Sequence, residues 1–164
     1  MLAANNTSLE DTKESTAAAR GDADVPDRSE LRPDEMRRLL PFMFIADAEN
    51  DPFRVRYRLV GTRAVEVTGF DITGHYLDEL LSAEPDQPWM DHYRQAYVSR
   101  KPLLGATTVP TNAGGMLTYE FGIFPLRKGT ASIDQFVAVE DYFGFVSQIV
   151  QVAPWRERGS RSDR

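Results

Sequence analysis

Residues 54–60 read RVRYRLV, a segment in which basic and apolar side chains alternate. Successive side chains of a β-strand point to opposite faces of its sheet, so this period of two predicts a strand with one buried and one solvated face. The side chains expected on the buried face are Val55, Tyr57 and Leu59. Those expected on the solvated face are Arg54, Arg56 and Arg58. Such a strand needs neighbouring strands and a covering layer, so the fold must contain a sheet.

The other periodic segments surround this strand. Residues 42–50 are strand-like and reach it through a polar turn at 50–52, which is the spacing of a hairpin. Residues 31–42 are expected to form a short helix that has Pro33 in its first turn and stops at Pro41. Helices are then expected at 62–67, 71–81 and 85–101, and strands at 103–111, 116–128 and 135–143. This order predicts an antiparallel α+β domain with the helices on one face of the sheet.

The 164 residues are enough for one domain with tails. Residues 1–30 contain seven acidic and three basic side chains and no aromatic one, so we expect a disordered acidic tail. The domain is expected to span 31–150, followed by a flexible polar tail at 151–164.

Composition excludes several classes of function. The formal net charge of −6 argues against a nucleic-acid partner. The absence of cysteine excludes thiol catalysis, disulfides, iron–sulfur ligation and thiol–flavin adducts. No signal peptide or apolar run of membrane-spanning length is visible, so we expect a cytoplasmic protein without membrane insertion.

The two histidines, His75 and His92, lie too far apart in sequence for a usual metal motif, so no metal site is expected. His92 lies on the helix with the aromatic residues Trp89, Tyr93 and Tyr97, where it could be a lone axial haem ligand or simply face solvent.

Catalytic residues are not expected, because the core segments contain no serine or cysteine nucleophile beside a base. Glu120 and Glu140 lie in predicted strands, and an inward-facing carboxyl there could act as an acid or base in a small α+β enzyme. Strand carboxylates more often face solvent, and we expect that of both residues.

Residues 38–81 resemble a family of small bacterial single-domain PAS proteins. The matching positions are Leu40-Pro41, Arg56-Tyr57-Arg58-Leu59, Gly61-Thr62, Gly69, Asp71, Thr73-Gly74 and Leu77-Asp78-Glu79-Leu80. The resemblance continues to about residue 142 through Lys101-Pro102 and Phe124-Pro125-Leu126. It implies the PAS fold, a five-stranded antiparallel sheet in the order 2-1-5-4-3 with the helices packed over one face.

The resemblance also implies a sensor or protein-interaction module in bacterial signalling, often dimeric, and it implies no particular cofactor. We therefore expect a non-catalytic homodimer that contacts a signalling partner, with its arginine face as the contact surface. A small apolar ligand is expected between the sheet and the aromatic helix, unless side chains fill that space and leave only an interaction module. The candidate ligand-binding residues are Phe44, Tyr57, Trp89, Tyr93, Tyr97, Phe121, Ile123, Val137 and Val139.

Overall fold

The computed structural model of the protein describes residues 25–81, 88–110 and 114–142. Its five strands form one antiparallel sheet in the order β2-β1-β5-β4-β3, which confirms the predicted topology. The strands are β1 (Met43–Glu49), β2 (Arg54–Val60), β3 (Leu103–Pro110), β4 (Met116–Leu126) and β5 (Gln135–Asp141).

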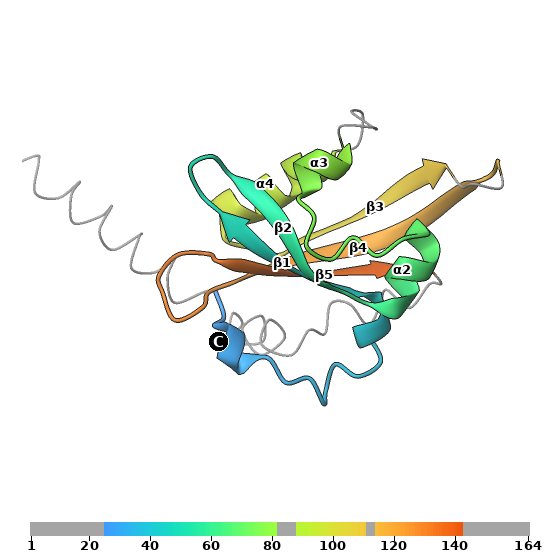
Figure 1. Ribbon diagram of the computed structural model, residues 1–164. Coiled ribbons are helices and arrows are strands. Elements are labelled where there is room, and N and C mark those ends of the chain that lie inside the picture. The colour runs from blue at the N-terminus through green and yellow to red at the C-terminus, as the bar shows by residue number, and fades with distance from the viewer. Residues whose placement is uncertain (1–24, 82–87, 111–113, 143–164) are drawn as a thin grey trace, which may run out of the picture.

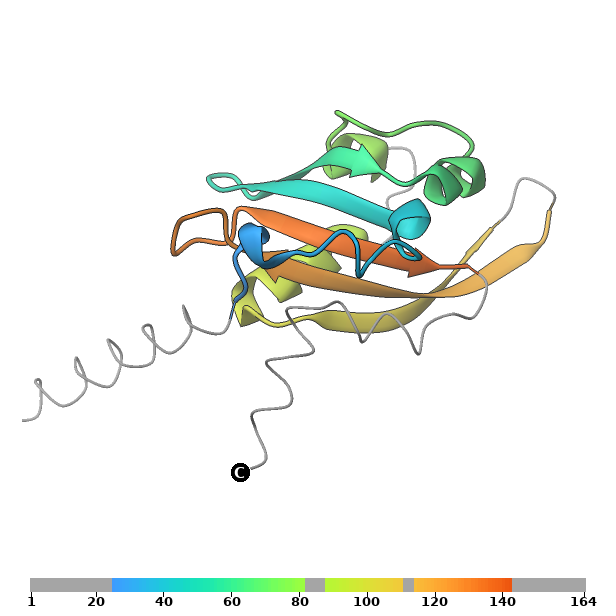
Figure 2. The same ribbon diagram turned by 90° about the horizontal axis from the view of Figure 1, so that it is seen from below.

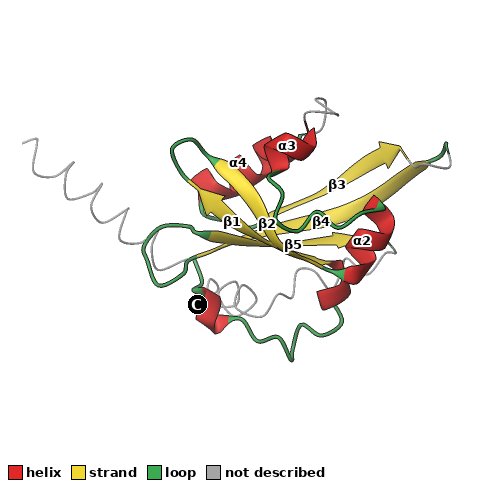
Figure 3. Ribbon diagram, in the orientation of Figure 1, coloured by secondary structure: helices red, strands yellow, loops and turns green. Residues whose placement is uncertain are grey.

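Three helices connect β2 to β3 and lie on one side of the sheet (Figure 1 and Figure 3). They are α2 (Thr62–Thr68), α3 (Leu77–Leu81) and α4 (Trp89–Ser99). The entry into α2 requires glycine, because a Cβ atom on Gly61 would lie 2.3 Å from the backbone oxygen of Pro41. None of the described helices has the length and apolar character needed to cross a membrane.

Both faces of the sheet are buried. On the helix-facing side, the core contains Phe44, Val55, Tyr57, Tyr93, Phe121, Ile123, Phe136 and Ala138. The opposite face holds a second cluster, formed by Met36, Met43, Phe124, Leu126, Val137 and Val139. Figure 2 shows the N-terminal segment crossing this second face, so the sheet lies between two covering layers.

The helix expected at 31–42 does not form. Residues 33–39 are consecutive turns, and the 3-10 helices η1 (Arg28–Glu30) and η2 (Leu40–Phe42) lie on either side. Pro41 disfavours helical geometry in the residue before it, and so short a segment is not stable as an isolated helix. Its apolar side chains still pack on the second cluster, through Leu31, Met36 and Leu39.

The folded region begins earlier than expected. Val25 is fully buried, and the backbone N–H of Arg127 donates to the Pro26 carbonyl over 2.9 Å. Asp27 caps η1 and accepts a hydrogen bond from the Gly129 N–H. The predicted domain boundary at residue 31 is therefore wrong by at least six residues. The predictions for residues 1–24 and 143–164 lie outside the described part of the chain.

The alternation of β2 holds only as far as Tyr57. Tyr57 lies opposite Ala46 and Leu59 lies opposite Ile45, so Arg58 is an extra residue in β2. This β-bulge turns Leu59 outward, where 47% of its surface is exposed, and the prediction that Leu59 is buried is wrong.

Candidate functional site

The aromatic residues of α4 lie over the helix-facing side of the sheet. Tyr93 is buried, with its ring centroid 5.1 Å from that of Phe136. Trp89, one turn earlier, lies edge-on to Phe121 at 4.9 Å. Because they are four residues apart, the two side chains lie on one side of the helix, as predicted. Their rings cover the sheet at Phe136 and Phe121.

Glu140 points into this aromatic region from β5. It lies opposite Phe121 of β4, is half-buried, and accepts a hydrogen bond from the Tyr142 hydroxyl. The expectation that Glu140 faces solvent is therefore wrong, whereas Glu120 is exposed as expected. Burial raises the pKa of Glu140 to about 7, and the hydrogen bond from Tyr142 offsets this effect only in part. The carboxyl group thus changes charge near neutral pH.

Four buried tyrosines surround the carboxyl group and form with it what we name the Glu140 cluster. They are Tyr57, Tyr93, Tyr119 and Tyr142. Burial raises the pKa of each phenol above its usual value, and the charge of Glu140 raises it further. The hydroxyls of Tyr57 and Tyr93 share a hydrogen bond. All four remain neutral at physiological pH and present hydroxyl groups near Glu140.

His92 contributes a second polar group to the region. Its ring stacks on Phe121 with centroids 4.9 Å apart, and its Nδ1 atom is buried without a hydrogen-bond partner among the described residues. Burial lowers the pKa of His92 despite the opposing charge of Asp91, which favours the neutral imidazole. His75 is exposed, and residues 25–81, 88–110 and 114–142 contain no group of three side chains suited to a metal ion.

Seven of the nine candidate ligand-binding residues lie on the helix-facing side. Five are in its core, namely Phe44, Tyr57, Tyr93, Phe121 and Ile123, while Trp89 and Tyr97 pack against them. Val137 and Val139 point to the opposite face, so their assignment to this site is wrong. Phe136, Ala138 and Glu140 occupy the helix-facing positions of β5 instead. Tyr119 and Tyr142 were not among the site residues predicted from the sequence. Tyr119 could have been found, because it is two residues from Phe121 in β4 and so faces the same side of the sheet.

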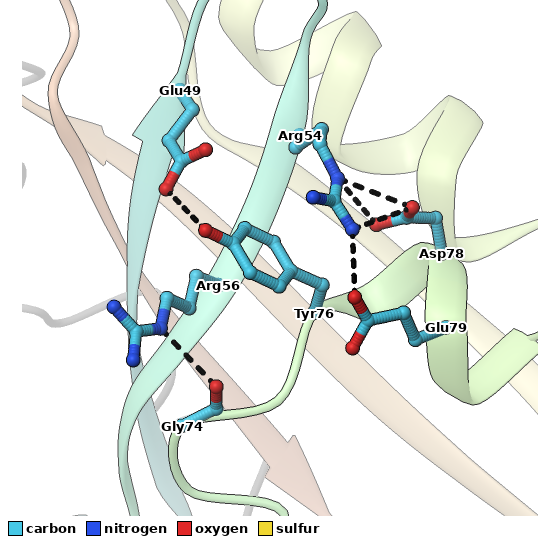
Figure 4. Close-up of polar contacts among 7 residues, drawn as sticks. All are labelled: Glu49, Arg54, Arg56, Gly74, Tyr76, Asp78 and Glu79. Carbon is cyan, nitrogen blue, oxygen red and sulfur yellow. Dashed lines mark hydrogen bonds and ion pairs between the residues drawn. The ribbon is translucent and has the colours of Figure 1, made fainter.

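The arginines of β2 make contacts within the domain (Figure 4). Arg54 forms ion pairs with Asp78 at 2.9 Å and Glu79 at 3.0 Å, and its guanidinium lies 3.7 Å from the centre of the Tyr76 ring. Arg56 donates to the carbonyl of Gly74 over 3.1 Å. These contacts attach α3 and the segment before it to the edge of the sheet.

The third arginine contact lies within the sheet, where Arg58 pairs with Asp47 at 2.6 Å. Two carboxylates of the N-terminal segment pair locally instead, Glu35 with Arg32 at 3.2 Å and Asp34 with Arg37 at 3.5 Å. Within the described residues, the arginines therefore stabilise the fold, and their role as an interaction face stays a prediction.

Comparison with known proteins identifies the family. Residues 5–139 match the family described as PAS domain. A search of curated proteins finds no match. Two solved structures share a TM-score of 0.51 with this chain. The dark structure of the blue-light photoreceptor Aureochrome1 LOV is 17% identical, over 74% of this chain and 89% of that one.

The second structure is a light-oxygen-voltage domain studied with a flavin analogue. It is 12% identical, over 76% of this chain and 93% of the other. Such low identity shows likeness of fold alone, and neither the structures nor the family match supports haem binding through His92. Because the family match spans most of the sequence and the sheet has the expected order, this chain belongs to the PAS domain family.

Proposed function

We propose that this PAS domain is a non-catalytic sensor in bacterial cytoplasmic signalling, and that it binds a small molecule between α4 and the sheet. The observation that carries the proposal is the Glu140 cluster, a titratable carboxyl group among buried tyrosines. Burying polar groups costs free energy that an apolar core would not incur. Such groups are therefore better explained by a ligand than by packing alone.

The chemistry of the region suggests the kind of ligand. Trp89 and Phe121 offer aromatic surface, while Glu140 and the Nδ1 atom of His92 offer polar contacts. A largely apolar molecule with one hydrogen-bonding group matches this combination. A cofactor is not proposed, because the likeness to the flavin-associated structure concerns the fold alone.

Tyr142 offers a route for the signal. Its hydroxyl donates to Glu140, and its ring packs on Tyr119 at 4.9 Å on the helix-facing side. The same ring lies 6.5 Å from Phe42, in the segment that covers the opposite face. A ligand that changes the contact between Tyr142 and Glu140 would therefore shift a side chain that touches both layers.

The PAS family to which this chain belongs includes protein-interaction modules that are often dimeric, so we propose a signalling partner and a homodimer. The arginine face of β2 is proposed as the partner surface through its exposed members, Arg56 and Arg58. The net charge of −6 makes a protein partner a better match than nucleic acid.

Native mass spectrometry of freshly purified protein tests the ligand proposal. The expected spectrum contains a species heavier than the chain by one discrete mass, which disappears under denaturing conditions. Glu140→Gln should reduce the fraction of this species, whereas Glu120→Gln, the same change at an exposed neighbouring position, should not. If the wild-type protein carries no such mass, ligand binding is contradicted and a side-chain-filled interaction module takes its place.

A further inference from the structure

The two edges of the sheet differ in how they are covered. At the β2 edge, the N–H of Tyr57 donates to the His75 carbonyl over 3.0 Å, and the N–H of Gly74 donates to the Tyr57 carbonyl over 2.7 Å. Arg56 and Tyr76 form a further bridge. The chain before α3 therefore pairs with the middle of this edge.

The opposite edge is formed by β3, which pairs only with β4 among the described residues and is the outermost strand in Figure 2. Every second residue of an edge strand turns its backbone N–H and C=O groups away from the sheet. The eight residues Leu103–Pro110 contain no charged side chain, and their one proline is at the end. Edge strands are usually protected by charges, proline or a covering segment. Residues 103–109 of β3 contain neither a charge nor a proline.

We infer that β3 pairs antiparallel with β3 of a second copy of this chain, so that one sheet runs through both protomers. This inference rests on the proposed homodimer and locates its interface. A second copy matches the edge because the strand is uncharged, so that a two-fold axis brings no like charges together. The central residues, Gly105 to Thr108, are small and let the two backbones approach.

The geometry restricts the register. Residues directly opposite each other in an antiparallel pair project from the same face, so the two-fold axis must pass between two copies of one residue. Ala106 is the central candidate, because it is exposed on the face turned away from the helices. Leu104, which is 49% exposed, then lies opposite Thr108 of the partner and loses part of its contact with water.

Sedimentation analysis of the full chain with Ala106→Lys tests the inference. Each protomer tolerates this change, because the lysine lies opposite Glu120 on β4. In the dimer two lysines would meet, and association should weaken by about tenfold or more. Leu59→Lys adds the same charge at an exposed position on the other edge and should leave association unchanged.

Cross-linking gives a second readout that does not depend on the lysine variant folding. The chain has no cysteine, so Ala106→Cys introduces its only thiol. Opposed Cα atoms in an antiparallel pair are close enough for a disulfide, and oxidation should yield a covalent dimer. Asn50→Cys, exposed in the turn between β1 and β2, should yield none.

A wild-type chain that stays monomeric up to about 1 mM would overturn the inference. So would a dimer that Ala106→Lys does not weaken, or one in which the two cysteine variants cross-link equally. None of these outcomes affects the mass spectrum of a retained ligand, so the edge-to-edge interface and the sensor proposal can fail separately.

Discussion

The raised pKa of Glu140 predicts an unusual dependence of stability on pH. In the folded chain the pKa is about 7, whereas the ordinary value of a glutamate is 4.5. Between these values the unfolded chain has already lost the proton that the folded chain still holds. The protonated Glu140 side chain therefore makes its full contribution to the stability of the folded state below about pH 4.5, and this contribution is lost as the pH rises through 7.

The structure sets the size of this effect. The interval from 4.5 to about 7 corresponds to about 2.5 pH units, and each unit is worth 1.36 kcal/mol, so the upper limit is about 3 kcal/mol. Because the side chain is only half-buried, solvent screens the charge, and we expect a loss of about 1–3 kcal/mol.

Urea denaturation of wild type and Glu140→Gln at pH 5, 6, 7 and 8 measures the effect. The free energy of unfolding of the variant, relative to wild type, should rise by about 1–3 kcal/mol between pH 5 and 8. Other titrating groups cancel in this difference, and an imperfectly hydrogen-bonded amide adds only a constant offset. A difference that does not vary with pH would show that Glu140 titrates like an exposed carboxyl group. That result would refute the conclusion that burial raises its pKa.

Three substitutions test the packing through urea midpoints. Val25→Ala should cost about 2 kcal/mol, because the side chain is fully buried; no cost would mean that the domain begins later. Gly61→Ala should cost about 3 kcal/mol or more, because its Cβ would meet the Pro41 backbone oxygen, and a neutral result would contradict this close approach. Gly105→Ala should cost about 1–3 kcal/mol, because its Cβ would lie 2.7 Å from Cζ of Phe121, a ring that also meets Trp89 edge-on and stacks on His92. Unchanged stability would show that the Phe121 ring can move away from the added methyl group.

The order of elements along the chain predicted an antiparallel α+β domain, and the family resemblance supplied the order of the strands in its sheet. Hairpins at both ends and a helical block between them, together with the resemblance of residues 38–81, led to the topology that the structure confirms. The aromatic face of α4 was also predictable, because Trp89, Tyr93 and Tyr97 repeat every four residues and all pack towards the sheet.

The sequence did not reveal which side chains of β5 face the helices and which face the N-terminal segment. Residues 135–139 are all buried, because the helices cover one face and the N-terminal segment covers the other. A strand buried on both faces has no alternation to follow. Val137 and Val139 were therefore assigned to the ligand side, and Glu140 was expected to face solvent.

Two other errors have local causes. The bulge at Arg58 reverses the facing of Leu59, and a bulge depends on pairing with β1 that the single strand does not reveal. The role of residues 25–30 was missed because the segment is short and polar. The one available signal was the spacing of Asp27 and Glu30, which forms a capping box.

The side-chain carboxyl of Glu140 is the titratable group of the proposed ligand site between α4 and the sheet, and it offers the most direct test of that proposal. Its ¹³C chemical shift can be followed by NMR as a function of pH, together with the ring resonances of Tyr119 and Tyr142. We predict a midpoint near 7 for the carboxyl group and matching shifts of both rings at the same pH. A midpoint near 4.5, with rings that do not respond, would contradict it.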